Sequence, residues 1–94
     1  MYYISTLCPA CSTGALGFRR CSDGKSIVLL CNECAAVWLQ PNTITAESAI
    51  FPTGPDYEVA ELGCTIASPR ADWAVRKEIE AAGWKAFIAG DGNP

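Results

Sequence analysis

Two pairs of cysteines, each separated by two residues, constrain this sequence most strongly. The pairs are Cys8–Cys11 and Cys31–Cys34, with 19 residues between them. Two intervening residues allow a tight turn to direct both sulfur atoms at one ion, and a second pair at this spacing completes a tetrahedron of four thiolates. The pattern therefore predicts one zinc ion with Cys8, Cys11, Cys31 and Cys34 as its ligands.

The segment between the two pairs predicts a β-hairpin. Asp23-Gly24 is a strong signal for a two-residue turn, because both positions tolerate positive φ angles. Largely apolar stretches flank this turn at residues 16–21 and 25–30. A turn at this position places Leu16 opposite Cys31. Both cysteine pairs then lie at the open end of the hairpin, where four sulfur atoms can meet.

With this hairpin, residues 2–40 resemble a zinc ribbon of the rubredoxin-like class. The resemblance rests on the four paired cysteines and the hairpin between them, and it implies an antiparallel sheet built around one structural ion. It covers under half of the chain, and no family is identified for the whole. Many such ribbons have glycine after the second cysteine of each pair. Here Ser12 and Ala35 stand there, so we expect less regular turns.

Other uses of the cysteines are weighed against zinc. Six cysteines in 94 residues are fewer than a disulfide scaffold typically has. Ser12-Thr13-Gly14 is a poor start for the helix that a thioredoxin-like dithiol requires. Iron bound by the same four thiolates, as in a rubredoxin-like electron carrier, stays open as an alternative. Cys21 and Cys64 fall outside the pattern, and we expect them to be buried thiols.

The composition excludes most catalytic classes. The chain has no histidine, which removes every serine–histidine or cysteine–histidine nucleophile and every histidine-ligated metal. A metal held by four thiolates also has no open position at which a water molecule could be activated. We therefore expect that the protein is not an enzyme.

Charge and hydropathy restrict the expected binding partners and cellular location. The formal net charge of −3 argues against sequence-independent binding of nucleic acids. The sequence has no run of about 18 apolar residues and so predicts no transmembrane helix. Residues 1–7 lack the basic and apolar regions of a secretory signal. These features predict a cytoplasmic protein that does not bind membranes.

The whole chain, residues 1–94, is expected to form one α+β domain. The ribbon occupies residues 2–40. Residues 41–67 predict an ordered loop with a short helical turn that begins at Thr45. Residues 68–90 predict a helix and a closing strand. The expected fold is therefore a small antiparallel zinc-ribbon sheet, with the C-terminal helix and the closing strand packed on it.

The C-terminal elements have clear sequence signals. Ser68-Pro69 is typical of the start of a helix, and Gly83 is typical of its end. Residues 84–88 alternate between apolar and other side chains and predict the closing strand. Residues 91–94 predict a frayed end.

Helical periodicity gives the candidate partner-binding residues. A helix through residue 82 directs Ala71, Val75, Ile79 and Ala82 toward the sheet and Trp73 away from it. One interpretation is that the loop 41–57 covers Trp73 or that Lys77 stacks on it. The other is that Trp73 is an exposed anchor for a protein partner. The residues predicted to bind a partner are Trp73, Lys77, Asp72 and Glu80.

The predicted function is that of a non-catalytic, zinc-stabilised protein-binding module. Its most specific form is an immunity or inhibitor protein that neutralises a basic toxin or nuclease, because residues 41–94 contain eight acidic and four basic residues. The first alternative is a nucleic-acid or transcription-associated zinc ribbon, motivated by Arg19, Arg20 and Lys25 with nearby aromatic residues. The second alternative is the rubredoxin-like electron carrier with iron.

Overall fold

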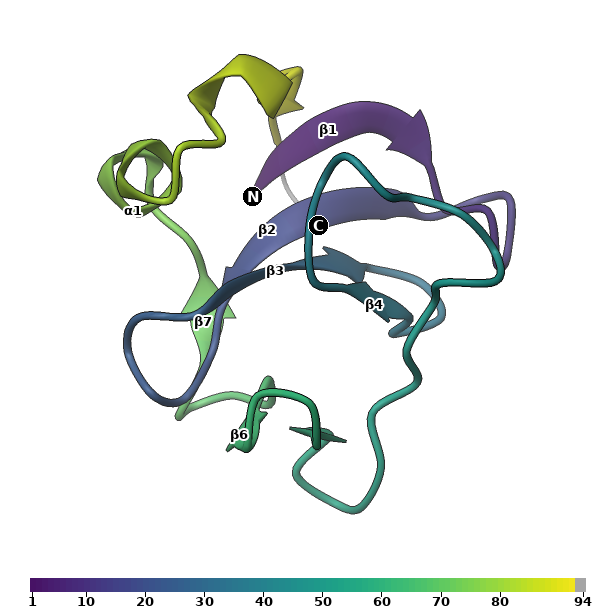
Figure 1. The fold of residues 1–94 in the computed structure, drawn as a ribbon, viewed down its shortest axis with the longest axis vertical. Helices are drawn as coiled ribbons and strands as arrows, with labels where there is room; N and C mark the ends of the chain where they lie inside the picture. Colours follow the sequence, from purple (N-terminus) through teal and green to yellow (C-terminus); the bar gives the residue numbers. More distant parts are fainter. Residues whose placement is uncertain (93–94) are drawn as a thin grey trace.

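The computed structural model describes residues 1–92 and consists mostly of antiparallel β-sheet with one short C-terminal helix (Figure 1). The main sheet has six strands in the order β4-β3-β2-β1-β8, and β7 also pairs with β2. Its strands are β1 (Tyr2–Leu7), β2 (Ala15–Arg20), β3 (Ile27–Cys31), β4 (Val37–Trp38), β7 (Asp72–Trp73) and β8 (Gly90–Asp91). A second sheet pairs β5 (Glu58–Val59) with β6 (Cys64–Thr65). The helices are α1 (Arg76–Ala81) and the 3₁₀ turn η1 (Lys85–Phe87).

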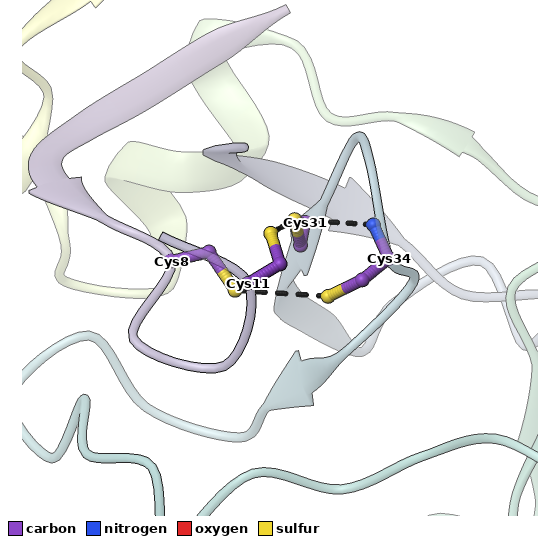
Figure 2. Close-up of side chains that lie close together, drawn as sticks. All are labelled: Cys8, Cys11, Cys31 and Cys34. Atoms are coloured by element: carbon purple, nitrogen blue, oxygen red, sulfur yellow. Dashed lines mark hydrogen bonds between the residues drawn. The ribbon is translucent and has the colours of Figure 1, made fainter. Parts of the chain in front are cut away.

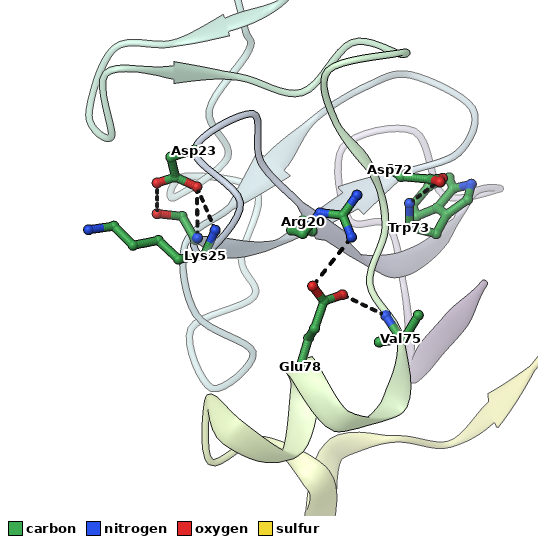
Figure 3. A network of polar contacts seen from close by, with 8 residues as sticks. Arg20, Asp23, Lys25, Asp72, Trp73, Val75 and Glu78 are labelled. Atoms are coloured by element: carbon green, nitrogen blue, oxygen red, sulfur yellow. Dashed lines mark hydrogen bonds and ion pairs between the residues drawn. The ribbon is translucent and has the colours of Figure 1, made fainter.

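The β2–β3 hairpin has the predicted register, with Leu16 opposite Cys31. The turn is longer than predicted and consists of residues 22–25. The hydrogen bond that closes it runs from the Cys21 N–H to the Ser26 carbonyl at 2.8 Å. Gly24 has a φ of 78°, and Asp23 instead accepts hydrogen bonds from two following backbone N–H groups (Figure 3). The register is preserved because the turn gains one residue on each side.

Both faces of β3 are covered, as its almost continuous apolar sequence predicts. All five of its residues are buried. Leu29 packs with Phe18 and Trp38 in one core cluster on the first face. Val28 and Leu30 belong to a second cluster, which also contains residues of β5 and β6. The chain beyond residue 41 therefore folds back onto the sheet, and Figure 1 shows the small second sheet below the main one.

The C-terminal helix is shorter than predicted. It covers Arg76–Ala81, and the preceding residues Asp72–Trp73 form β7. Strand β1 pairs with β2 only as far as Gly17, so the same edge of β2 is open at Arg19 and Arg20, where β7 pairs. Residues 72–73 therefore pair with the sheet, and the helix begins only after them.

The start and the end of α1 are fixed by local contacts. The Glu78 carboxylate accepts a hydrogen bond from the Val75 N–H at 2.9 Å, which satisfies a donor that the helix leaves unpaired. At the other end, Gly83 has a φ of 82°, and the Trp84 N–H donates to the Ile79 carbonyl at 3.1 Å. This is the Schellman arrangement, so the predicted stop at Gly83 is confirmed.

The closing strand forms, but it lies later in the chain than predicted. Residues 84–88 contain η1 instead of a strand, and Trp84 packs near Phe18 with 6.3 Å between ring centroids. Strand β8 pairs with β1, with Gly90 opposite Tyr3. A Cβ atom at Gly90 would overlap the Tyr3 side chain, so this close pairing requires glycine. Of the predicted frayed end, 91–92 are ordered by β1 and 93–94 lie outside the described residues.

The predicted loop 41–67 contains β5 and β6 in its second half, which the sequence did not predict, and the segment between β4 and β5 is an ordered loop. Thr45 caps a single turn, in which its hydroxyl accepts from the Ser48 N–H at 3.2 Å. The Trp38 indole N–H donates to the Thr45 carbonyl at 2.8 Å and ties this turn to β4. None of the helices in residues 1–92 has the length and apolar character that crossing a membrane requires.

Candidate metal centre

The four predicted ligands come together at one end of the β2–β3 hairpin (Figure 2). Cys8 and Cys11 lie in the turn that follows β1, and Cys31 and Cys34 lie where β3 turns into β4. All four sulfur atoms lie within 4.8 Å of one another. The structure therefore contains a four-thiolate cluster that could hold one metal ion.

The sulfur separations fit a tetrahedral ion. A Zn–S bond of about 2.3 Å implies sulfur atoms about 3.8 Å apart in a tetrahedron. Two of the six separations are 3.7 Å, between the sulfurs of Cys8 and Cys34 and between those of Cys11 and Cys31, and all six are within 4.8 Å. Four cysteine sulfurs at this spacing complete a coordination shell of four.

Hydrogen bonds to the sulfur atoms of Cys31 and Cys11 favour their thiolate forms, which are the forms that bind a cation. The backbone N–H groups of Glu33 and Cys34 each point at the Cys31 sulfur at 3.4 Å. The backbone N–H and the hydroxyl of Thr13 lower the pKa of Cys11 to about 6. Such contacts stabilise thiolates.

Burial has the opposite effect on the second pair. It raises the pKa of the Cys31 thiol, and it raises the pKa of the Cys34 thiol to about 12. Removing four thiolates from water without a cation is unfavourable, and a bound ion reverses this preference. The electrostatics of the cluster thus favour a metal-bound form.

The two cysteine turns have the same backbone form, contrary to the expected irregularity. Ser12 and Ala35 have φ angles of 66° and 64°. The Ser12 N–H donates to the Cys8 carbonyl at 2.8 Å, and the Ala35 N–H donates to the Cys31 carbonyl at 3.3 Å. Both residues therefore adopt the left-handed conformation that glycine would adopt with less strain.

Replacing Ser12 with glycine is expected to stabilise the metal-loaded protein by about 0.5–1 kcal/mol. The left-handed strain of serine is relieved, and part of this gain is offset by the greater freedom of glycine in the unfolded chain. Thermal unfolding should show a melting temperature roughly 3–6 °C higher. Ser5→Gly, at an exposed position within β1, is the control and should lower it. A destabilised Ser12→Gly protein would contradict this account.

Two residues near the cluster were not identified from the sequence. A Cβ atom on Gly14 would overlap the Cys31 sulfur, so a larger residue does not fit beside this sulfur. The Asn32 side chain accepts from the Ala15 N–H at 3.0 Å, and the Asn32 N–H donates to the Ala15 carbonyl at 3.1 Å. Gly14 ends the first cysteine turn and could have been identified from the sequence. The two hydrogen bonds between Asn32 and Ala15 depend on the tertiary fold.

The residues predicted to bind a partner do not share one helical face. Asp72 and Trp73 lie on β7, whereas Lys77 and Glu80 lie on α1. Glu80 forms an ion pair with Arg76 at 3.1 Å. The placement of Trp73 on the outer face of a helix is therefore wrong, because the edge of β2 draws this segment into the sheet.

Trp73 is half-buried and is covered in a different way from either predicted contact. The Arg19 guanidinium lies over its ring at 4.9 Å from the centroid. The indole also packs against the second core cluster. Lys77 lies on α1 with an exposed side chain. A stacked cation does cover Trp73, but it comes from β2.

Cys21 and Cys64 are buried in the second core cluster, as predicted, and take no part in the four-thiolate cluster. Burial raises the pKa of Cys21 to about 12 and also raises that of Cys64. Thiols with raised pKa values are poor nucleophiles near neutral pH. These two cysteines therefore act as apolar core residues.

Comparison with curated proteins shows similarity to uncharacterized protein L48 of Acanthamoeba polyphaga mimivirus, with 26% identity over 87 residues. The aligned region covers 87% of this chain and 72% of that protein. No protein-family model matches the chain, and no solved structure matches it. The chain is thus similar over most of its length to a mimivirus protein, and a functional assignment depends on the geometry of its own residues.

Proposed function

We propose that the protein is a non-catalytic protein-binding module stabilised by one zinc ion. The observation that carries this proposal is the spacing of the four sulfur atoms, which together would fill all four positions around a tetrahedral ion. Zinc sites that activate water keep one position open, whereas structural sites are closed by protein ligands. The cluster therefore favours a structural role.

Elemental analysis of freshly purified protein distinguishes zinc from iron. We expect one zinc per chain and a colourless protein. One iron per chain, with visible colour and a reversible redox couple, would instead support the rubredoxin-like electron carrier. A protein that contains neither zinc nor iron would contradict both proposals.

A candidate partner surface is the acidic lobe, defined as residues 51–63, which contains β5. Phe51 is 59% exposed and Tyr57 is 48% exposed. The exposed carboxylates of the lobe are Asp56, Glu58 and Glu61. Residues 41–69 contain no lysine or arginine, so no neighbour in the sequence compensates these charges. Exposed aromatic side chains among uncompensated carboxylates fit a basic protein partner.

The nucleic-acid alternative is disfavoured by the positions of the hairpin cations. Arg19 is buried, and Arg20 forms an ion pair with Glu78 at 3.3 Å (Figure 3). Of the three basic residues that motivated this alternative, Lys25 alone is exposed without an ion pair within residues 1–92. One such cation is too few for the electrostatic contact that nucleic-acid binding requires.

An immunity or inhibitor protein is the most specific form of this proposal. Such a protein needs shape and charge complementary to a basic toxin or nuclease, and the acidic lobe would supply both. Loss of a candidate toxin's activity when the two proteins are mixed would support it. Unchanged activity at equimolar concentration would count against that pair.

The partner surface is tested by affinity capture from the source cells with the metal-loaded protein. We expect a basic protein to be retained, to be released as salt rises, and to be lost with Phe51→Ser. Leu7→Ser, another exposed apolar residue outside the acidic lobe, is the control and should retain the partner. Equal capture by both variants, or none by the wild type, would contradict the assignment.

A further inference from the structure

A pocket of about 340 Å³ lies beside the metal centre on the second face of the sheet. This volume falls within the range of small-molecule sites. Its apolar wall includes Leu30, Ile66 and the two aromatic residues Tyr57 and Trp73. Arg19 also lines it. The pocket therefore combines apolar surface with a cationic group.

The guanidinium of Arg19 is held rigidly on one side. Arg19 is 7% exposed. Its Nε and Nη2 atoms donate to the Ile66 carbonyl at 3.0 and 2.8 Å. Nη2 also donates to the Ser68 hydroxyl at 3.2 Å and to the Ala71 carbonyl at 3.4 Å. The ring of Trp73 covers one face of the group. Position and orientation are thus fixed before any ligand arrives.

The other side of the guanidinium has no protein partner. Nη1 makes no hydrogen bond within residues 1–92, and neither ion pair described there includes Arg19. The one fully enclosed side-chain polar atom without a partner in this part of the chain is Thr65 Oγ1. Nη1 is therefore not fully enclosed by protein, and the side chain to which it belongs lines the pocket.

Among residues 1–92 Arg19 is buried without an ion pair, an unfavourable arrangement that the charge of nearby Asp72 only partly offsets. Burial lowers the pKa of Arg19 from its ordinary value, which reflects this loss of hydration, although an arginine stays charged. A carboxylate oxygen can accept a charge-assisted hydrogen bond from Nη1. The exposed carboxylate of Glu33 also lines the pocket and disfavours ligands with a second negative charge.

We propose that this pocket binds an apolar monocarboxylate, whose carboxylate pairs with Nη1 of Arg19 and whose apolar body lies against Trp73 and Tyr57. This chemistry occurs in free aromatic acids and in the C-terminal residue of a peptide. The inference goes beyond the proposed function. Phe51, which tests the partner surface, does not line this pocket, so the two proposals can fail separately.

The test is a titration of the metal-loaded protein with 3-phenylpropionate, followed by tryptophan fluorescence and by calorimetry. The neutral 3-phenylpropanamide is the matched ligand, and it should bind at least about tenfold more weakly because it cannot form the charged pair. A fragment of this size is expected to bind with a Kd of about 10 mM or tighter. Equal binding of acid and amide, or no binding of the acid at about 10 mM, would overturn the proposal.

Two variants check the position of the ligand. Arg19→Gln should weaken acid binding by about tenfold or more and leave amide binding unchanged. Should this variant fail to fold, Ala67→Leu narrows the pocket while Arg19 is retained and should abolish binding. Ala46→Leu, exposed and outside the pocket, is the control. Binding that survives Ala67→Leu would contradict the assigned pocket.

A second titration separates the two sources of the carboxylate. A short peptide that ends in phenylalanine is compared with its C-terminally amidated form. Tighter binding of the free-acid peptide than of 3-phenylpropionate would assign the site to chain termini. Weaker binding of this peptide would assign it to free acids. Both results require that the amidated peptide binds more weakly than the free-acid peptide, and a reversed order would contradict the role of Arg19.

Discussion

Cys31→Ser is expected to abolish metal binding and to unfold the ribbon. Cys31 is the cysteine of the cluster that ends β3, and its sulfur receives two backbone hydrogen bonds. A structural zinc ion contributes roughly 10–16 kcal/mol to folding in small zinc domains, whereas whole domains are stable by only about 5–15 kcal/mol. The loss of one of four ligands therefore removes an amount comparable with the entire free energy of unfolding.

The matched control for this variant is Cys64→Ala. Cys64 is also a buried cysteine, but it lies outside the four-thiolate cluster. We expect Cys64→Ala to keep one metal per chain and a cooperative thermal transition, with a modest loss of stability. Elemental analysis and circular dichroism read out both properties. One metal per chain and an unchanged melting temperature in Cys31→Ser would show that this residue is not a structural ligand.

Trp38→Ala is expected to have the next largest effect, a loss of about 3–5 kcal/mol. Trp38 is 1% exposed in the first core cluster. Its indole N–H also holds the turn at Thr45 through the bond at 2.8 Å. The truncation leaves a large cavity, removes the indole donor of the Thr45 carbonyl, and releases the loop that follows β4.

Chemical unfolding in urea measures this loss, with Trp38→Phe as the control. Phenylalanine keeps most of the buried ring but not the hydrogen bond, so its cost should be smaller, about 1–2 kcal/mol. Limited proteolysis should cut residues 41–49 faster in Trp38→Ala than in Trp38→Phe. Equal stability of the two variants would contradict the central role of this side chain.

The sequence predicted the β2–β3 hairpin and the four-cysteine cluster well because their constraints are local or nearly so. Two cysteines separated by two residues lie in one turn, and a turn signal at Asp23-Gly24 sets the hairpin register over its whole length. Leu16 pairs with Cys31 as predicted, even though the turn is longer, because the register depends on the centre of the turn. Predictions that rest on a single turn of chain do not need the remaining fold.

The C-terminal half was predicted less well because its local signals compete with the sheet. Residues 68–75 have helix-start signals, yet Asp72–Trp73 pairs with the edge of β2 that β1 leaves open. The β-strand that closes the sheet is Gly90–Asp91, since glycine permits the approach to Tyr3. A short segment follows the partner that its tertiary neighbours offer, and propensity alone does not reveal that partner.

The sequence by itself therefore determined the four cysteines of the cluster, the hairpin that brings them together, and the need to cover both faces of β3. The tertiary structure alone decided where the helix begins, that Trp73 stacks on Arg19, and that Arg19 is buried beside a pocket. The physical reason is the separation along the chain between the residues that interact. Ligand spacing and turn geometry act within one hairpin, whereas burial, cation stacking and pocket formation depend on residues about 50 positions apart in the chain.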